Sequence, residues 1–306
     1  MAKTKEKFHD PNQQKFANIK GFSLVAPAVF LISLFTVYPI IFTLYWAFHS
    51  GNLISPDSKY VGMNNFRYLF STPSFLKVLM NTVFYSVIVV VLTIAVATLL
   101  AVLFRSNGKL HKKFNGFVQA VIFTPHIISL VSVSMVFLWL FDSQVGFLNS
   151  IITAIGLNAF PFFTSPKTAL FSLVLVMVWK QAGYYTLLIM AALQGVPQEI
   201  YEAASIDDAP AYKTFFRITL PMISPTLFFV SITATISSFQ IFDAVNLITG
   251  GGPLNSTNTL VYYIYEQTYK FGKLGTGSAA SLLLLILVGV LTFLYFKVLE
   301  KRVHYQ

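Results

Sequence analysis

The stretch VLMNTVFYSVIVVVLTIAVATLLAVLF, residues 78–104, decides the fold class, because no charged side chain interrupts its 27 residues. A helix needs about 20 consecutive apolar residues to cross the hydrocarbon core of a membrane. Five more runs of about that length occur along the chain. We predict membrane spans over residues 22–48, 78–104, 117–141, 168–193, 222–247 and 278–298. The sequence therefore predicts an all-α, polytopic membrane protein with about six transmembrane helices.

The composition also indicates that lipid is the solvent of this chain. Of its 306 residues 56% are hydrophobic and only 10% are charged, whereas a soluble domain carries about 25% charged residues. The formal net charge of +10 comes from basic residues beside the apolar runs, so membrane topology explains it better than a nucleic-acid partner does. The chain has no cysteine, and its five histidines show no metal-ligand spacing, so we expect no metal site. No arrangement of Ser, His and Asp predicts a catalytic site.

Basic residues fall unevenly on the two sides of the predicted spans. One side holds fourteen of them: Lys3, Lys5, Lys7, Lys15, Lys20, Arg105, Lys109, Lys112, Lys113, Lys213, Arg217, Lys297, Lys301 and Arg302. The other side holds six: Lys59, Arg67, Lys77, Lys167, Lys270 and Lys273. Because basic loops resist translocation, we expect both termini in the cytoplasm. This division predicts a basic cytoplasmic N-terminal arm over residues 1–21, a six-helix transmembrane domain over 22–298 and a cytoplasmic tail over 299–306.

The longest cytoplasmic loop, residues 197–221, has the pattern of two short helices. PQEIYEAASI, residues 197–206, begins with proline, carries acidic residues in its first turns and contains good helix formers. DDAP, residues 207–210, supplies a break, an N-cap and a second helix-starting proline, and the helical pattern resumes until Pro221. Ala203 and Ala204 leave a small, smooth surface that another backbone or groove can approach closely. We interpret this loop as a docking element.

The same loop resembles a known family signature. Glu202-Ala203-Ala204, then Asp207, then Ile218-Thr219-Leu220-Pro221 is similar in residue type and spacing to the EAA loop of permease subunits in bacterial ATP-binding-cassette importers. Asp208 stands where that family usually has glycine, and Asp tolerates a left-handed turn. The resemblance implies that these residues couple the permease to an ATPase: Glu202, Ala203, Ala204, Asp207, Asp208, Ala209, Leu220 and Pro221.

Further segments resemble the carbohydrate-uptake branch of that family, which takes up sugars and glycerol 3-phosphate. They are GGGP at 250–253 with the segment 257–265, GFLN at 146–149, and VHYQ at 303–306. The resemblance implies a second homologous permease subunit, an extracytoplasmic solute-binding protein and two cytoplasmic ATPases that bind ATP and Mg. It also implies the bacterial cell membrane as the location. The chain has no G-x-x-x-x-G-K-[ST] loop to hold ATP phosphates, so we expect no cofactor in it and no enzymatic activity of its own.

Counting from Glu202, the sugar-facing positions of a maltose permease in that family fall on two helices of this chain. The resemblance therefore implies substrate contacts at Lys180, Gln181, Tyr184, Ser237, Ser238 and Ile241. Met177, Ala234 and Ile241 are apolar at such positions, so we expect either a solute other than maltose or weak binding at these positions.

Lys180 admits two interpretations. As a cation at membrane depth it is a functional candidate, which favours an anionic solute such as glycerol 3-phosphate. It is also able to snorkel, or to pair with a carbonyl group or with Asp243, in a purely structural role. A self-sufficient secondary transporter is the alternative from another class, but such proteins show ion-binding acids near the midplane, where this sequence offers only Asp243.

Overall fold

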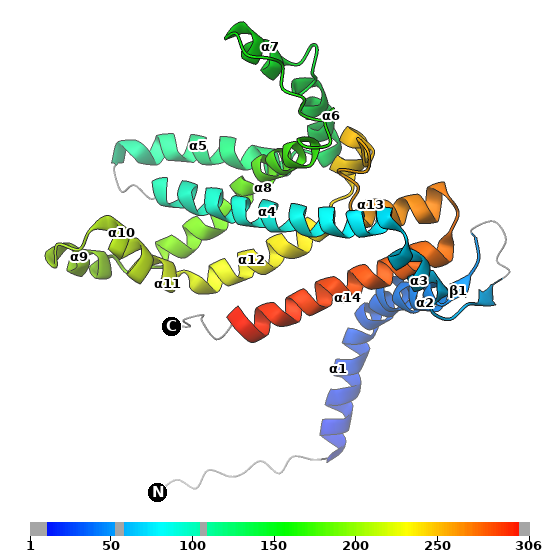
Figure 1. Ribbon diagram of the computed structural model, residues 1–306. Coiled ribbons are helices and arrows are strands. Elements are labelled where there is room, and N and C mark those ends of the chain that lie inside the picture. The colour runs from blue at the N-terminus through cyan, green and yellow to red at the C-terminus, as the bar shows by residue number, and fades with distance from the viewer. Residues whose placement is uncertain (1–10, 53–57, 105–108, 300–306) are drawn as a thin grey trace, which may run out of the picture.

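The computed structural model describes residues 11–52, 58–104 and 109–299 (Figure 1). Its first half comprises α1 (Pro11–Ile32), the π-helical turn η1 (Ser33–Val37), α2 (Tyr38–Ala47), β1 (His49–Ser50), β2 (Lys59–Tyr60), α3 (Asn64–Ser71), α4 (Pro73–Leu103), α5 (Lys109–Ile127), α6 (Leu130–Leu140) and α7 (Phe147–Ala154). Its second half comprises α8 (Ala169–Gln194), α9 (Gln198–Ile206), α10 (Ala211–Thr214), η2 (Phe215–Thr219), α11 (Leu220–Met222), α12 (Ser224–Phe239), η3 (Val245–Thr249), α13 (Leu260–Tyr265), η4 (Glu266–Lys270) and α14 (Leu274–Leu299).

Six segments are suited to crossing a membrane. Four are single helical stretches that are long and apolar enough: Gly21–Ala47, Pro73–Leu103, Ala169–Gln194 and Leu274–Lys297. The other two are bent pairs of helices. If each bent pair is counted as one span, the number agrees with the six predicted spans, and the helical content confirms the all-α class.

The third and fifth predicted spans are not straight helices, and here the prediction was wrong. Residues 117–141 form α5 and α6, which meet at 99°. Pro125 lies in the last turn of α5, and a proline removes a backbone donor from the helix. In the fifth predicted span, residues 222–247, α12 begins at Ser224 and is bent by 72° against the preceding segment Ala211–Met222. It then stops at Phe239 rather than continuing to residue 247, and residues 245–249 form a separate π-helical turn.

The two ends of the predicted domain also differ from expectation. Residues 11–20 of the predicted N-terminal arm are helical and continue into the first span as α1. The rest of the arm, residues 1–10, and residues 300–306 of the tail lie outside the described residues.

The main core forms where α4 packs along α8 and α12. Tyr85 and Val89 of α4, Leu173 and Ile189 of α8 and Val230 of α12 are almost fully buried in one hydrophobic cluster. A smaller cluster joins α2 and α3 to α14, whose Ala279 and Ala280 allow close contact. By contrast, α1 stands clear of the bundle (Figure 1), and no residue of its most apolar window is buried.

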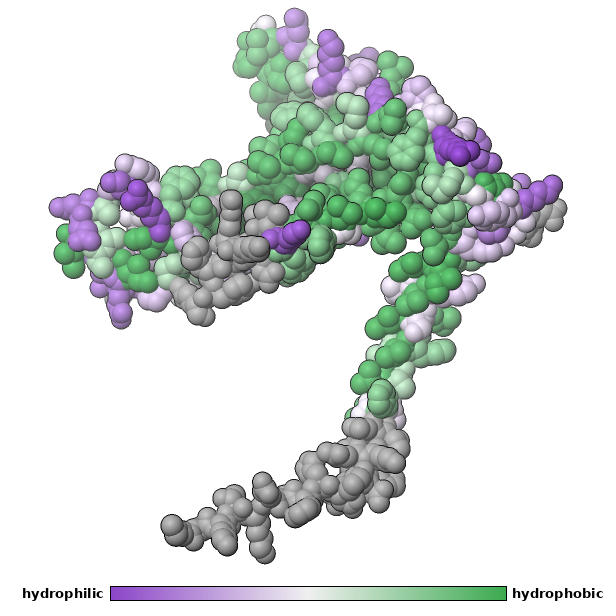
Figure 2. All heavy atoms as spheres, turned by 60° about the horizontal axis from the view of Figure 1, so that its bottom comes forward, coloured by the Kyte–Doolittle hydropathy of each residue, from purple (hydrophilic) through white to green (hydrophobic). Residues whose placement is uncertain are grey.

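Most of the segments predicted to face the cytoplasm lie together, but the start of α1, from the predicted N-terminal arm, lies apart from them at the bottom of Figure 1. The end of α4, the start of α5, the α9–α11 segment and the end of α14 gather at the left of Figure 1, whereas the β1–β2 hairpin and α3 lie at the right. Figure 2 shows hydrophilic side chains at these two extremities and hydrophobic ones over the helices between them. This distribution is the one expected of a bundle with a lipid belt.

Candidate functional site

Lys180 of α8 binds the broken end of α5. Its Nζ atom donates hydrogen bonds to the carbonyl oxygens of Ile128 at 2.7 Å, Pro125 at 3.1 Å and His126 at 3.3 Å. The last carbonyl groups of a helix have no partner within the helix, and its C-terminus attracts a cation. The ammonium group therefore satisfies groups that the 99° bend leaves open. The sequence analysis considered a carbonyl group or Asp243 as the partner of Lys180. In the described part of the chain the Lys180 ammonium group donates to carbonyl groups and not to Asp243.

Two more residues on the same face of α8 hold α5 in place. Gly183 faces the carbonyl group of Ile122 so closely that a Cβ atom would overlap it. The Tyr184 ring stacks on the His126 ring, with centroids 4.5 Å apart and planes inclined by 11°. Residues 180, 183 and 184 share one helix face because they are three and four positions apart. We call Lys180, Gly183 and Tyr184, with these partners, the α5–α8 clamp.

The other residues predicted to contact solute differ in accessibility. On α8, Gln181 is half-buried, as is Tyr184. On α12, Ser237 is exposed, and Tyr185 of α8 interacts with it. Ser238 is buried and its hydroxyl donates to the carbonyl oxygen of Thr235 at 2.7 Å.

Two apolar residues at or near the predicted contact positions are buried in the core. Ile241 is buried at 3% exposure in the main core. Met177 is buried in the same cluster, against which Tyr184 packs. In this conformation Lys180, Gln181, Tyr184 and Ser237 are therefore the accessible polar members of the predicted set, and the ammonium group of Lys180 is already engaged by carbonyl groups. His126, which the sequence analysis did not select, is exposed beside them.

The predicted coupling loop is a helical hairpin at the end of α8. Residues 195–197 join α8 directly to α9, and α10, η2 and α11 return towards α12. The hydroxyl groups of Tyr201 and Thr219 lie 3.1 Å apart and fasten the two arms together. Asp208 makes the turn with φ of 50°, so the left-handed conformation expected there is present. The N-cap of α10 is Pro210, without a side-chain hydrogen bond, and the aspartate cap predicted from the sequence is absent.

The two alanines of the loop face opposite ways. Ala203 is exposed, as are Glu202, Asp207 and Asp208. Ala204 is only 7% exposed, and its carbonyl oxygen accepts a hydrogen bond from the backbone of Ala209. The expectation that both alanines present a docking surface is therefore wrong: Ala204 packs inside the hairpin. Leu220 and Pro221 are half-buried at its base.

The tip of the hairpin exposes large apolar side chains that the sequence analysis did not select. Ile206 is 83% exposed, Tyr212 64% and Phe216 62%. They lie on the same hairpin as the exposed Ala203, the carboxylates of Glu202, Asp207 and Asp208, and the exposed basic residues Lys213 and Arg217. An exposed apolar surface at the end of a membrane bundle is typical of a protein interface. The pattern was readable, because Tyr212 and Phe216 are four residues apart on one helix face.

Comparison with known proteins places this arrangement among transport proteins. Residues 90–305 match the sequence model of a family described as binding-protein-dependent transport system inner membrane component. The lactose transport system permease protein LacF of Rhizobium radiobacter is 36% identical over 294 residues, covering 94% of this chain and 97% of that protein. The sn-glycerol-3-phosphate transport system permease protein UgpA of Agrobacterium fabrum is 32% identical, covering 94% and 97%.

Solved structures show the same fold. A chain of a bacterial ABC transporter involved in the import of the acidic polysaccharide alginate superposes with a TM-score of 0.82 at 22% identity, covering 94% of this chain and 99% of that one. A structure of a bacterial alginate ABC transporter in complex with its oligosaccharide-bound periplasmic protein gives the same score at 21% identity, covering 92% and 94%.

Proposed function

The chain belongs to the family of binding-protein-dependent transport system inner membrane components, and on this premise we propose that it is a permease subunit of an ATP-driven importer for a carbohydrate or related solute. It is a transport component rather than an enzyme. The carbohydrate class rests on relatives such as the lactose permease LacF, with which it shares 36% of its residues over almost its whole length. The bacterial cell membrane is its location.

The observation that carries the ATP-driven mechanism is the helical hairpin at the end of α8. Its exposed tip, formed by Ala203, Ile206, Tyr212 and Phe216, has the chemistry of a docking surface. In this proposal the tip fits a groove of a cytoplasmic ATPase subunit, and two such subunits bind ATP and Mg. Glu202 supplies a carboxylate for charge-assisted hydrogen bonds with the partner. Closure of the ATPases then moves the hairpin and α8 as a rigid body.

The translocation path lies between this chain and a second homologous permease subunit. Two features support a partner subunit. Helix α1 stands clear of the bundle, and polar groups of α8 and α12 remain accessible when this chain is considered alone. Gln181, Tyr184 and Ser237 contact the solute, since aromatic faces, amides and hydroxyl groups are what a sugar binds. In this proposal Lys180, Ser238 and Ile241 do not contact the solute, and they hold the helices that carry the contacting residues in position. An extracytoplasmic binding protein delivers the solute.

A test of coupling uses the complete importer in reconstituted vesicles. Ala203→Trp overpacks the docking surface at a cost of about 1–3 kcal/mol, enough to weaken ATPase docking about tenfold. We expect Ala203→Trp and Glu202→Lys to insert normally and to lose solute-stimulated ATP hydrolysis and uptake together. Ala154→Trp, on exposed α7 at the opposite side, is the matched control and keeps both activities. Full ATP-dependent uptake by either loop variant would overturn the proposal.

An anionic solute is the second candidate, because UgpA, named for sn-glycerol 3-phosphate, is 32% identical over a similar length. The charge of Lys180 does not add to this candidate, since three carbonyl groups already engage it. Uptake of labelled lactose-type sugars and of glycerol 3-phosphate by the same vesicles separates the two. Uptake without any ATPase subunit would instead support a secondary transporter.

A further inference from the structure

The connection between α6 and α8 carries no charged residue over residues 143–166. At the average of about 25% charged residues, a segment of these 24 residues in water would carry about six. The connection leads to the start of α8, whereas the coupling hairpin follows the end of α8. It therefore lies on the opposite side of the bundle, which is extracytoplasmic in the proposed orientation. Helix α7 of this connection stands at the top of Figure 1, away from α14.

One face of α7 is fixed against the bundle. Leu148 and Ile152 pack on the hydrophobic cluster that α6 and α8 share. Asn149 is only 2% exposed, and its Nδ2 atom donates to the carbonyl oxygens of Asp142 and Phe160, both at 3.0 Å. Its Oδ1 atom accepts a hydrogen bond from the backbone N–H group of Phe160 at 2.7 Å. These contacts set the rotation of α7, so the directions of its other side chains are defined.

The remaining surface of α7 is divided between apolar and polar residues. Successive residues of a helix are about 100° apart, so Phe147 and Ile151 share one face. They are 54% and 46% exposed, and Ile155, directly after the helix, is 68% exposed. Ser150 and Thr153, on the other flank of the exposed surface, are exposed as well. Helix α7 thus has a face towards the protein, an apolar face and a polar face.

The apolar face of α7 continues a series of exposed apolar side chains that begins in the membrane span. On α6, Met135 is 61% exposed and Trp139 is 59% exposed. Trp139 lies in the last turn of α6, and tryptophan is enriched where a span reaches the membrane surface. After α7, Leu157 is 61% exposed and Phe160 is 41% exposed. The series therefore runs along the chain from α6 past α7, and no charged residue follows Asp142 within it.

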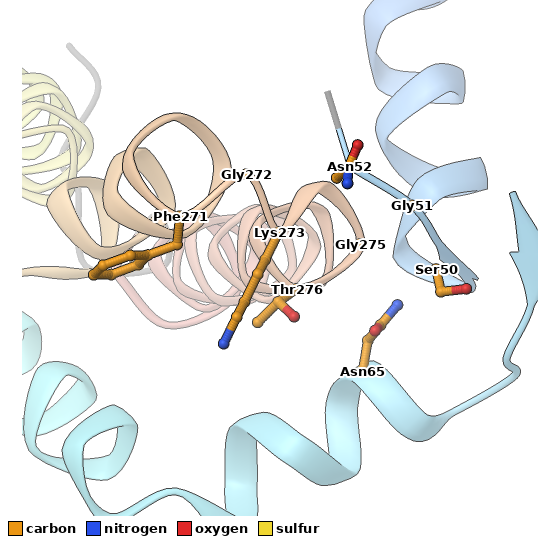
Figure 3. Close-up of a pocket in the computed structure, with 9 residues that line it drawn as sticks. All are labelled: Ser50, Gly51, Asn52, Asn65, Phe271, Gly272, Lys273, Gly275 and Thr276. Atoms are coloured by element: carbon orange, nitrogen blue, oxygen red, sulfur yellow. The ribbon is translucent and has the colours of Figure 1, made fainter. Parts of the chain in front are cut away.

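Another part of the extracytoplasmic side has a different character. A pocket of about 490 Å³ opens between α2, α3 and the start of α14 (Figure 3). Polar side chains line it, among them Asn52, Asn65 and Thr276, and the side chain of Lys273 extends along it. A protein interface in water has a rim of such polar groups. The uncharged surface around α7 fits a lipid surface better than it fits a soluble protein.

We infer that α7 lies in the interface of the outer membrane leaflet and anchors the outer end of α6 there. Phospholipid acyl chains cover Phe147, Ile151 and Ile155, while Ser150 and Thr153 face water. A helix with an apolar and a polar face lies along a membrane surface in this way, with its apolar face about 5–10 Å into the boundary between headgroups and acyl chains. The inference depends on the membrane location of the chain and not on the proposed ATPase or solute.

The test measures fluorescence quenching in the complete importer in lipid nanodiscs, with the other subunits free of reactive cysteine. This chain has no cysteine, so Ile151→Cys and Thr153→Cys each carry a single bimane label, at positions about 200° apart around α7. We expect phospholipids brominated near the headgroup to quench the label at position 151 about threefold more strongly than the label at position 153. Iodide in the water should show the reverse order. Assembly of each variant is checked by co-purification of the ATPase subunits.

The outcomes distinguish what covers α7. Ser71→Cys, on exposed α3, is the control in water and should behave as Thr153→Cys does. Stronger iodide quenching of the Ile151→Cys label would overturn the inference and leave the apolar face to a soluble partner. Protection of that label from both quenchers would also overturn it and assign the face to the second permease subunit. Stronger quenching by lipids brominated at the chain ends than by those brominated near the headgroup would refute the interfacial position.

Discussion

Replacement of Lys180 by Met tests whether the α5–α8 clamp is structural. Methionine keeps the length and apolar stem of the side chain but removes the three donors that reach the Pro125, His126 and Ile128 carbonyl groups. These carbonyl groups would then lack partners at the bend between α5 and α6. We therefore expect the bundle to lose stability around this bend.

The size of the effect follows from the contacts. Hydrogen bonds to charged groups contribute about 1.5–3 kcal/mol each in soluble proteins, but bonds between membrane helices average only about 0.6 kcal/mol. Three bonds that share one ammonium group are not additive. We expect a loss of about 2–4 kcal/mol in the free energy of unfolding, which is roughly 30-fold to nearly 1,000-fold in the unfolding equilibrium.

The assay is unfolding of the purified complex by denaturing detergent, followed through tryptophan fluorescence. Lys180→Arg retains charge and donors and should recover most of the stability. Gln181→Met changes the neighbouring residue in the same way, outside the clamp, and should be nearly neutral for stability. In transport, Lys180→Met should reduce uptake of neutral and anionic solutes equally. Unchanged stability together with selective loss of anionic uptake would refute this reasoning and assign Lys180 to charge recognition.

Three further expectations follow from the structure. In intact cells, an impermeant thiol reagent should label Ser71→Cys, on exposed α3, but not Ser205→Cys, on exposed α9; the reverse pattern would refute cytoplasmic termini. Gly183→Leu should force α5 away from α8 and prevent assembly, because even a Cβ atom there overlaps the α5 backbone; normal yield of the complex would contradict this contact. Backbone N–H groups of the next turn, that of Val145 foremost, hold the pKa of Asp142 below its usual range. Protection of these N–H groups, measured as the ratio of the intrinsic exchange rate at each pH to the observed rate, should therefore be high at neutral pH and be lost as the pH falls below about 4 and through the lowered pKa, and Asp142→Asn should abolish this dependence.

Hydropathy predicts the spans of this chain well, because each run of apolar residues reports only that a segment is long enough for lipid. The hydropathy of a run does not indicate the direction in which its helix points. The bend after Pro125 was indicated by the proline, but its angle depends on α8, whose Lys180 binds carbonyl groups more than 50 positions away in sequence. The end of α12 at Phe239 was likewise not indicated by the apolar run that continues to residue 247.

The resemblance of the 197–221 loop to a family signature located the coupling hairpin but not the orientation of its side chains. Ala203 and Ala204 are adjacent and chemically identical, so sequence alone treats them alike. The packing of α9 in the hairpin, where the Tyr201 and Thr219 hydroxyl groups lie 3.1 Å apart, leaves one alanine exposed and the other buried. The spacing of Tyr212 and Phe216 was readable from the sequence, but their exposure, and that of Ile206, was not.

Because α8 continues directly into the coupling hairpin, α8 is a lever arm. Fourteen positions separate Lys180 from Gln194, where α8 ends, and at 1.5 Å per residue this is about 21 Å. A tilt of about 5° imposed at the hairpin would shift the Lys180 end by about 2 Å. That displacement exceeds what a hydrogen bond tolerates, so α5 has either to swing with α8 or to be released from it. Because Gly183 and the stacked Tyr184 also tie the two helices together, we expect α5 to swing with α8, so that, under the proposed function, a movement imposed at the hairpin is carried to the bend before α6.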